Sequence, residues 1–306
     1  MIIGVDFGAP REARKQRRKI IAIAAQAAGR RAYRIDATGL NQRLLASDPP
    51  GWSARALLEE LLARPARVIG FDFPFSVPRA LLREPRFAAD AGYPDGAFTD
   101  WRSFSQWISR RLPLTDPIDF APFARWRASS TAARARLWMK RATDEDAGGQ
   151  PPLKDLFQAT FQMTLLGNAL LAKLWESHRY RVQPFRDGSG DGEVIEVYPG
   201  ATLRAMKLPQ YKSHPDEAVR LAIEACAIAG ITIDVDPRLR DVATSYSSGS
   251  AKAPDHDVAD AFVALCTAIL YAEGACRPAL APEVLAHDPP VTESEGAIWV
   301  PKEGGL

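Results

Sequence analysis

The fold is decided by the stretch at residues 2–10, IIGVDFGAP, in which an apolar run ends in a carboxylate. Because its apolar side chains leave no polar face, we predict a central strand that is covered on both sides. Asp6 would lie at the carboxyl end of this strand, where open α/β sheets bind their ligands. A second interpretation is that Asp6 only caps the turn at residues 7–10.

A second stretch of the same form follows at residues 66–80, ARVIGFDFPFSVPRA. Its apolar residues predict another buried strand, which ends at Asp72, and Pro74 stops the strand from continuing. A helix predicted over residues 54–63 crosses between the two strands, so the strands should be parallel. Asp6 and Asp72 are therefore expected at the same end of the sheet, which favours a shared site over two isolated caps.

The rest of the first half predicts a meander followed by a helical insertion. The isoleucines from Ile20 onward indicate a second strand, Gly29 a turn, and residues 32–35 a third strand, all antiparallel. From about residue 79 to 178, Pro-punctuated stretches and helices indicate a mainly helical insertion, with a loop at residues 144–152. Its tryptophans are interleaved with arginines, which can bind nucleic acid, although core tryptophans beside a solvated arginine face are the favoured interpretation.

The composition is that of an ordinary globular protein. The chain has 306 residues, 46% of them hydrophobic and 25% charged, which is enough for a single domain with a sizeable core. No basic leader precedes the first strand and no apolar run approaches the ~20 residues of a membrane span, so we expect a cytoplasmic protein without a membrane partner. The three cysteines form no CxxC pair, which indicates neither a disulfide framework nor a zinc site.

Charge is distributed unevenly along the chain. Residues 1–141 hold 25 Lys and Arg against 13 Asp and Glu, and the remainder holds 14 against 24. This asymmetry suggests a basic surface for an anionic partner, although a solvated face would also explain it. Arg17, Arg18 and Lys19 closely follow the strand of Asp6, so their loop is the predicted contact for nucleic acid.

The last helix carries a further pair of carboxylates. Residues 255–274, DHDVADAFVALCTAILYAEG, predict a buried helix in which Asp257 and Asp260 share one face of the first turn. The pair could serve simply as a double cap, since helix N-termini favour carboxylates. Together with Asp6 and Asp72, however, it forms a set of hard oxygen ligands that suits Mg²⁺ or Mn²⁺ better than zinc. Two such ions can activate a water and stabilise the leaving oxygen of a phosphodiester.

Five motifs in this order resemble the domain-of-unknown-function 429 family (DUF429). They are GVDFG at 4–8, GFDFPFSVP at 70–78, EVYPGATLRAMKLPQYK at 196–212, DHDVADAFVALCTAILYA at 255–272 and EGAIWVP at 295–301. The resemblance implies a nuclease with an RNase H-like fold, that is, an α/β mixed sheet flanked by helices. The last helix is also similar to the last catalytic helix of RuvC-type Holliday-junction resolvases, in which two aspartates complete the metal site.

The resemblance also implies the site residues. The candidate catalytic residues and ligands of two Mg²⁺ or Mn²⁺ ions are Asp6, Asp72, Asp257 and Asp260. RNase H proper takes a glutamate from its first helix, whereas Glu59 and Glu60 lie too far along the predicted helix here. Glu196 is therefore a candidate catalytic residue, and Tyr198 and Lys212 are candidate substrate contacts.

The predicted function is a metal-dependent nuclease that acts on DNA or RNA. One rival is an actin-like ATP-dependent phosphotransferase, which shares a first strand followed by a DxG turn. Against it, no second DxG turn follows at Asp72, and no Gly-Gly pair occurs between residues 150 and 300. The other rival is a non-catalytic module that binds nucleic acid or protein on the same fold.

Overall fold

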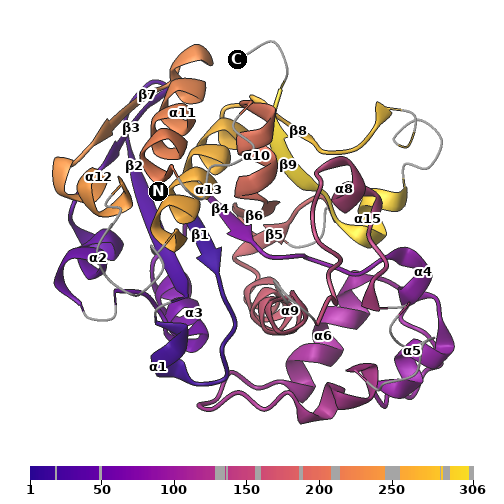
Figure 1. Ribbon diagram of the computed structural model, residues 1–306. Coiled ribbons are helices and arrows are strands. Elements are labelled where there is room, and N and C mark those ends of the chain that lie inside the picture. The colour runs from indigo at the N-terminus through magenta and orange to yellow at the C-terminus, as the bar shows by residue number, and fades with distance from the viewer. Residues whose placement is uncertain are drawn as a thin grey trace.

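The described residues of the computed structural model form one mixed sheet with helices on both faces (Figure 1). They are residues 1–17, 19–47, 50–127, 135, 137–155, 160–185, 189–207, 214–244, 256–282, 284 and 290–302. This arrangement confirms the predicted α/β class, and it is compatible with an RNase H-like fold.

The sheet has nine strands within the described ranges. They are β1 (Ile2–Phe7), β2 (Ile20–Gly29), β3 (Ala32–Ile35), β4 (Val68–Asp72), β5 (Tyr180–Val182), β6 (Gly192–Val197), β7 (Thr232–Val235), β8 (Cys276–Pro278) and β9 (Ile298–Pro301). Their order is β7-β3-β2-β1-β4-β6-β9-β8, with β5 paired to β6. The predicted antiparallel meander of β1, β2 and β3 is confirmed.

The register of β1 and β4 places the two strand-end carboxylates side by side. The strands are parallel, and Asp6 is the partner of Asp72 in the ladder. Both aspartates therefore lie at the same end of the sheet, as the helix between the strands predicted. That helix begins after Ser53, whose side chain accepts a hydrogen bond from the Ala56 N–H at 3.2 Å.

Helices cover both faces of the sheet. The helices of the described residues are α1 (Ala13–Gln16), α2 (Gln42–Ala46), α3 (Ala54–Ala63), α4 (Arg79–Leu82), α5 (Pro85–Asp90), α6 (Trp101–Arg111), α8 (Ala142–Asp146), α9 (Phe161–Glu176), α10 (Pro199–Ala205), α11 (Pro215–Ile228), α12 (Pro237–Thr244), α13 (Asp257–Ala272) and α15 (Pro290–Glu295), with 3-10 turns η1 (Gly39–Asn41) and η2 (Ala121–Arg127). One core joins the sheet to α3, α6 and α9, and the other joins it to α11 and α13. None of the helices in the described parts of the chain is long and apolar enough to cross a membrane.

The insertion at residues 79–178 is mainly helical, as predicted, and its aromatic residues are largely core. Trp101 and Trp126 are buried, whereas Trp138 is 44% exposed. The predicted loop at residues 144–152 was wrong in its first three residues, which belong to α8. The reason is a buried pair, because Asp144 accepts hydrogen bonds from Arg141 and so fixes the first turn of that helix.

Helix α13 packs directly on the sheet because two glycines leave room for it. Gly4 of β1 and Gly70 of β4 are partners in the parallel ladder. A Cβ at Gly4 would lie 2.5 Å from the Ala261 carbonyl oxygen and would overlap the backbone of Leu265. Each glycine stands two residues before an aspartate, and alternate residues of a strand share a face. The face that admits α13 is therefore the face that carries Asp6 and Asp72.

We expect Gly4→Ala to destabilise the protein more than Gly70→Ala. A Cβ at Gly70 would lie 3.1 Å from the Ala264 carbonyl oxygen, which is tight, whereas at Gly4 it would overlap helix backbone. Overpacking costs about 1–3 kcal/mol, and Gly4→Ala should reach or pass the upper end of that range. Urea unfolding followed by circular dichroism measures both variants. Equal losses would mean that α13 does not rest on Gly4.

Candidate active site

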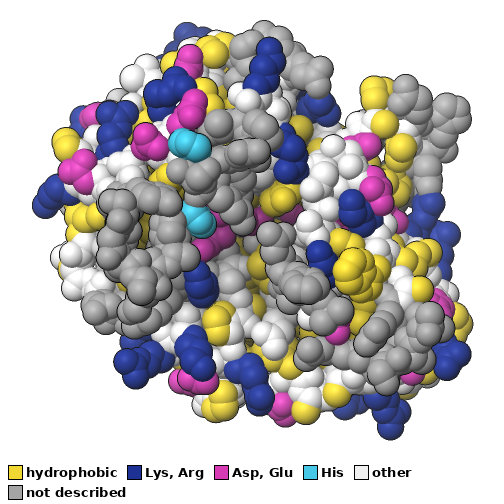
Figure 2. Space-filling view, viewed as in Figure 1, with side chains coloured by type: hydrophobic (Ala, Val, Ile, Leu, Met, Phe, Trp, Pro, Cys, Tyr) yellow, Lys and Arg dark blue, Asp and Glu magenta, His cyan; other side chains and the backbone are white. Residues whose placement is uncertain are grey.

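Four aspartates from three elements lie near one another at the carboxyl ends of β1 and β4. Asp6 and Asp72 end their strands, while Asp257 and Asp260 occupy the first turn of α13. Burial raises the pKa of Asp6 most, and the charges of Asp257, Asp260 and Asp72, in that order, raise it further. Figure 2 shows acidic side chains in a hollow near the middle of one face. The structure thus brings the four predicted aspartates together.

The first turn of α13 carries two aspartates whose charges act on Asp6. The N-cap position belongs to His256, so neither Asp257 nor Asp260 is the cap residue. Asp260 is buried, and the positive end of the helix dipole favours both negative charges. The electrostatic action on Asp6 is a feature that a double cap alone would not require.

Lys19 brings a positive charge to these aspartates. Its carbonyl accepts a hydrogen bond from the Gly8 N–H at 2.5 Å, which joins the two ends of the connection between β1 and β2. Its Nζ lies 2.6 Å from Oδ2 of Asp257, and its charge lowers the pKa of Asp6 against the effect of the carboxylates. The sequence indicated that Lys19 contacts nucleic acid, but here its ammonium group is directed to an aspartate.

The chemistry of the four aspartates fits a hard divalent cation, but their arrangement does not form a finished ligand set. Carboxylate oxygens are the ligands that Mg²⁺ and Mn²⁺ prefer, and clustered negative charges need a cation. However, no three His, Cys, Asp or Glu side chains among the described residues are arranged to hold a metal ion. The charges of the other three aspartates act on Asp6, and Asp257 forms an ion pair with Lys19.

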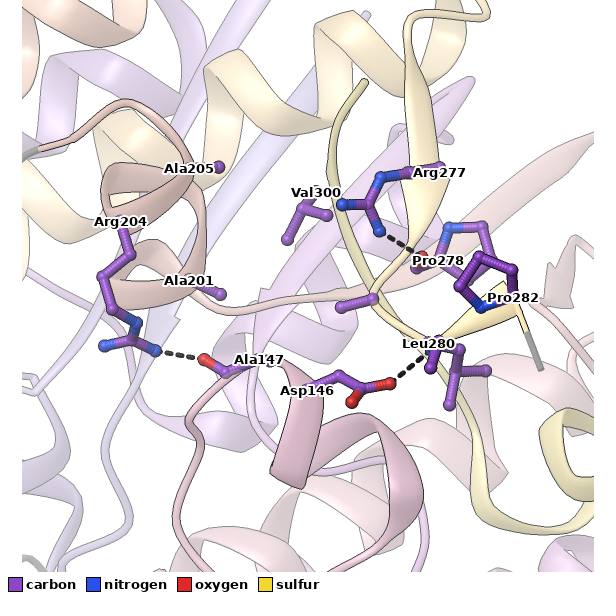
Figure 3. A pocket seen from close by; sticks show the side chains of 12 residues that line it. Asp146, Ala147, Ala201, Arg204, Ala205, Arg277, Pro278, Leu280, Pro282 and Val300 are labelled. Atoms are coloured by element: carbon purple, nitrogen blue, oxygen red, sulfur yellow. Dashed lines mark hydrogen bonds between the residues drawn. The ribbon is translucent and has the colours of Figure 1, made fainter. Parts of the chain in front are cut away.

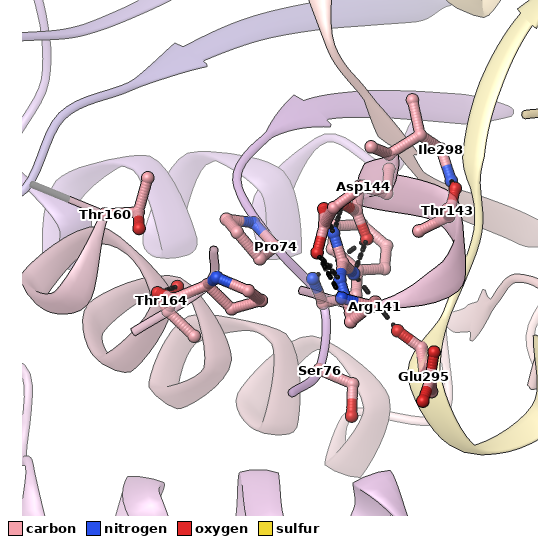
Figure 4. A network of polar contacts seen from close by, with 12 residues as sticks. Pro74, Ser76, Arg141, Thr143, Asp144, Thr160, Thr164, Glu295 and Ile298 are labelled. Atoms are coloured by element: carbon pink, nitrogen blue, oxygen red, sulfur yellow. Dashed lines mark hydrogen bonds and ion pairs between the residues drawn. The ribbon is translucent and has the colours of Figure 1, made fainter. Parts of the chain in front are cut away.

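Glu196 belongs to a buried network centred on Arg141 (Figure 4), and Glu196, like Tyr198, lines the same small cavity as Asp72. Nη1 and Nη2 of Arg141 donate to the two carboxylate oxygens of Glu196 at 2.7 and 2.5 Å. Nε and Nη2 donate to Asp144 at 2.9 and 2.7 Å. Glu196 also accepts a hydrogen bond from the Phe75 N–H at 3.0 Å. These contacts join β6 to α8 and to the segment that follows β4.

The predicted catalytic role of Glu196 gains no support from this network. Burial raises the pKa of Glu196, Arg141 opposes that rise, and Asp144 adds to it. The charged groups that act most on Glu196 are thus its ion-pair partner Arg141 and the second carboxylate bound to that arginine, Asp144, rather than the four aspartates. Sequence reasoning missed Arg141, and the available signal was a glutamate between Ile195 and Val197 in a buried strand, which needs a cationic partner.

The remaining predicted contacts are distributed around the site. Tyr198 and Asp72 line the same small cavity, of about 60 Å³, so Tyr198 is close to the aspartates. Arg17 is exposed near the start of β2. Arg18 and Lys212 lie outside the described residues.

Comparison with known proteins gives a family but no activity. Residues 4–284 match the family model described as a protein of unknown function, DUF429. This is the family that the sequence motifs resemble. No curated protein matches the chain, and no solved structure does.

Replacing Asp6 with Asn is expected to stabilise the metal-free protein above the ordinary carboxyl pKa of ~3.9. The raised pKa means that the folded state binds the proton of Asp6 more tightly than the unfolded chain does. The free energy of unfolding should therefore fall as pH rises through that raised pKa, and Asp6→Asn should remove the fall. Each tenfold difference in proton affinity corresponds to about 1.4 kcal/mol.

Urea unfolding in chelator across a series of pH values measures this effect. Asp241→Asn is the control, because Asp241 is exposed on α12. An Asp6→Asn variant that is less stable than the wild type at every pH would show that the carboxylate of Asp6 supports the fold.

Arg141→Met is expected to cost about 3–5 kcal/mol of stability, because it leaves Asp144 and Glu196 buried without their shared cation. Lys140→Met is the matched control, since the neighbouring Lys140 makes only a 3.3 Å ion pair with the exposed Glu145. We expect the control to change stability by less than about 1 kcal/mol. Chemical unfolding compares the two variants, and similar losses would argue against a structural role for the network.

Proposed function

The chain belongs to the DUF429 family, and we propose that it is a metal-dependent nuclease that hydrolyses phosphodiester bonds of DNA or RNA. The observation that carries this proposal is the register of β1 and β4, which pairs the partly buried Asp6 with Asp72 at one end of the sheet, together with the first turn of α13, whose Asp257 and Asp260 act on Asp6 by their charge. Negative charges gathered away from water are costly unless cations compensate them. Such a cluster at the carboxyl ends of parallel strands is suited to binding a divalent ion beside a substrate.

The proposed function gives each of the four aspartates a role at the metal site. Mg²⁺ or Mn²⁺ would supply Lewis-acid chemistry that activates a water and stabilises the leaving oxygen. Asp6, whose pKa is raised by the charges of all three other carboxylates, would bind both ions. Asp72 would bind one ion, and Asp257 with Asp260 the other.

Lys19 would hold the site ready before an ion binds. Its ammonium group neutralises part of the negative charge and keeps Asp257 in place. In the proposed function Asp257 would help to hold the ion, and Lys19 would contact a phosphate oxygen of the substrate, which is the role that the sequence indicated for it.

A nucleic-acid substrate is supported by charge. The excess of Lys and Arg over residues 1–141 would attract a polyanion that the aspartates alone would repel. The exposed Arg17 lies close in sequence to Lys19, and Tyr198 borders the cavity that Asp72 shares.

Cleavage assays with single-stranded and double-stranded DNA and RNA, in Mg²⁺, Mn²⁺ or chelator, test this function. We expect cleavage only with a divalent ion, and a loss of roughly 100-fold or more in Asp72→Asn and Asp257→Asn, since each removes a charge worth several kcal/mol at the metal site. Asp241→Asn, on the exposed surface of α12, should cleave like the wild type.

A crystal soaked in Mn²⁺ gives a second readout that does not depend on activity. Ions should be bound by Asp6, Asp72 and at least one of Asp257 and Asp260. Ordered carboxylates more than about 8 Å apart with no ion between them would end the metal-site hypothesis, because paired catalytic ions lie ~3.5–4 Å apart. Nucleic-acid binding without cleavage would favour a non-catalytic module, and ATP turnover would favour the phosphotransferase.

A further inference from the structure

The small cavity that Asp72 lines marks one border of the candidate site. A larger cavity, of about 690 Å³, lies between α10, α8 and the strands β8 and β9 (Figure 3), but it shares no lining residue with the cavity of Asp72. Gln150, in the loop between α8 and α9, does line the cavity of Asp72. Side chains that contact Gln150 therefore lie beside the candidate site.

The loop that carries Gln150 leads to an exposed tryptophan. Lys154 donates a hydrogen bond from Nζ to Oε1 of Gln150 at 2.7 Å. The same Nζ lies over the ring of Trp138, 5.1 Å from its centroid. Direct contacts thus run from the cavity of Asp72 through Gln150 and Lys154 to Trp138.

The start of α9 holds this loop in place. The Lys154 N–H donates to the Pro151 carbonyl at 3.1 Å, and the Lys154 carbonyl accepts a hydrogen bond from the Phe161 N–H at 2.9 Å. Oγ1 of Thr160 also donates to the Pro151 carbonyl. The ammonium group that lies over Trp138 therefore comes from a backbone segment that is fixed before any ligand binds.

Trp138 differs from the other tryptophans of the chain. It is 44% exposed, whereas the other six are buried or half-buried. Its neighbours Leu137 and Met139 pack into the core, so the backbone on both sides of Trp138 is anchored. Because Lys154 can lie over only one face of the ring, exposed aromatic surface remains for a ligand.

We propose that Trp138 stacks on an unpaired base of the nucleic acid that is bound at the aspartates, an inference that rests on the proposed function because it takes nucleic acid as the substrate. An exposed ring beside a cation is the combination that single-strand sites use, since the ring stacks on a base and the cation attracts the phosphates. Bases inside a duplex are stacked on one another, whereas unstacked bases are open to an aromatic side chain. The substrate class is therefore a nucleic acid that is single-stranded beside the cleaved bond.

Fluorescence anisotropy in Ca²⁺ with two labelled strands tests the proposal. One is an oligothymidylate of about 12 nucleotides, within the ~4–16 that single-strand sites cover, and the other is an abasic strand of the same length, which keeps the phosphates. Trp138→Ala should bind the oligothymidylate roughly 10- to 100-fold more weakly than the wild type does, and the abasic strand equally well. Its dependence of log affinity on log salt should not change, because stacking releases no counterions.

Two further variants separate stacking from a general loss of apolar surface. Trp138→Phe keeps an aromatic ring and should recover most of the affinity for the oligothymidylate. Ile228→Ala is the matched control, since Ile228 is 51% exposed on α11 and does not line the cavity of Asp72. Circular dichroism checks that each variant is folded.

Wild-type affinity of Trp138→Ala for the oligothymidylate would overturn the proposal, and so would an equal loss of affinity for the abasic strand. A wild type that binds neither strand would overturn it too. If Trp138→Ala only converts a dimer into a monomer in sedimentation, the ring belongs to an interface between copies of the chain and the proposal is wrong.

The cleavage assay separates this inference from the proposed function. Base-dependent binding through Trp138 in a protein that cleaves nothing would contradict the nuclease alone. Cleavage by a protein whose binding does not depend on Trp138 would contradict only the stacking contact.

Discussion

The close contact between α13 and the paired glycines Gly4 and Gly70 is the constraint on which the rest of the structure depends. Without a Cβ on either strand at this point, helix backbone rests almost directly on sheet backbone. Because each glycine precedes its aspartate by two residues, the same contact sets how near the first turn of α13 comes to Asp6 and Asp72. The packing of α13 on the sheet and the assembly of the candidate site therefore depend on the same contact.

The protein buries carboxylates in two different ways. Asp144 and Glu196 share Arg141, whose hydrogen bonds satisfy them from within the chain. A buried network of this kind fixes geometry and leaves little chemistry to perform. The pKa of Asp6 instead depends on the charges of three other carboxylates, which raise it, and on that of Lys19, which lowers it. Such a strained electrostatic balance is typical of functional sites, although ion-pair networks also shift pKa values.

The sequence predicted the features that follow from periodicity and chain order. The meander, the parallel pair and the buried last helix each rest on a long apolar run, and the shared end of Asp6 and Asp72 rests on the crossover rule. The strands β5, β7, β8 and β9, of three or four residues, were not predicted, because runs so short carry little signal unless a turn glycine and a preceding strand mark them, as they do for β3. The periodicity of a sequence also cannot show which charged side chains, far apart in the chain, form pairs in the folded protein. Lys19 and Asp257 are 238 residues apart, and the pairing of Glu196 with Arg141 could not be seen from the sequence either.

The order of these segments along the chain has a consequence for biosynthesis. Asp257 and Asp260 are made roughly 250 residues after Asp6. At ~5–20 residues per second, ribosomal synthesis leaves a delay of roughly 10–50 s in which β1 has no α13 to cover it. A nascent or prematurely terminated chain therefore contains the strand-end aspartates without their helical partners. If the cluster cuts nucleic acid, the messenger being translated is exposed to that chemistry only after α13 has been made.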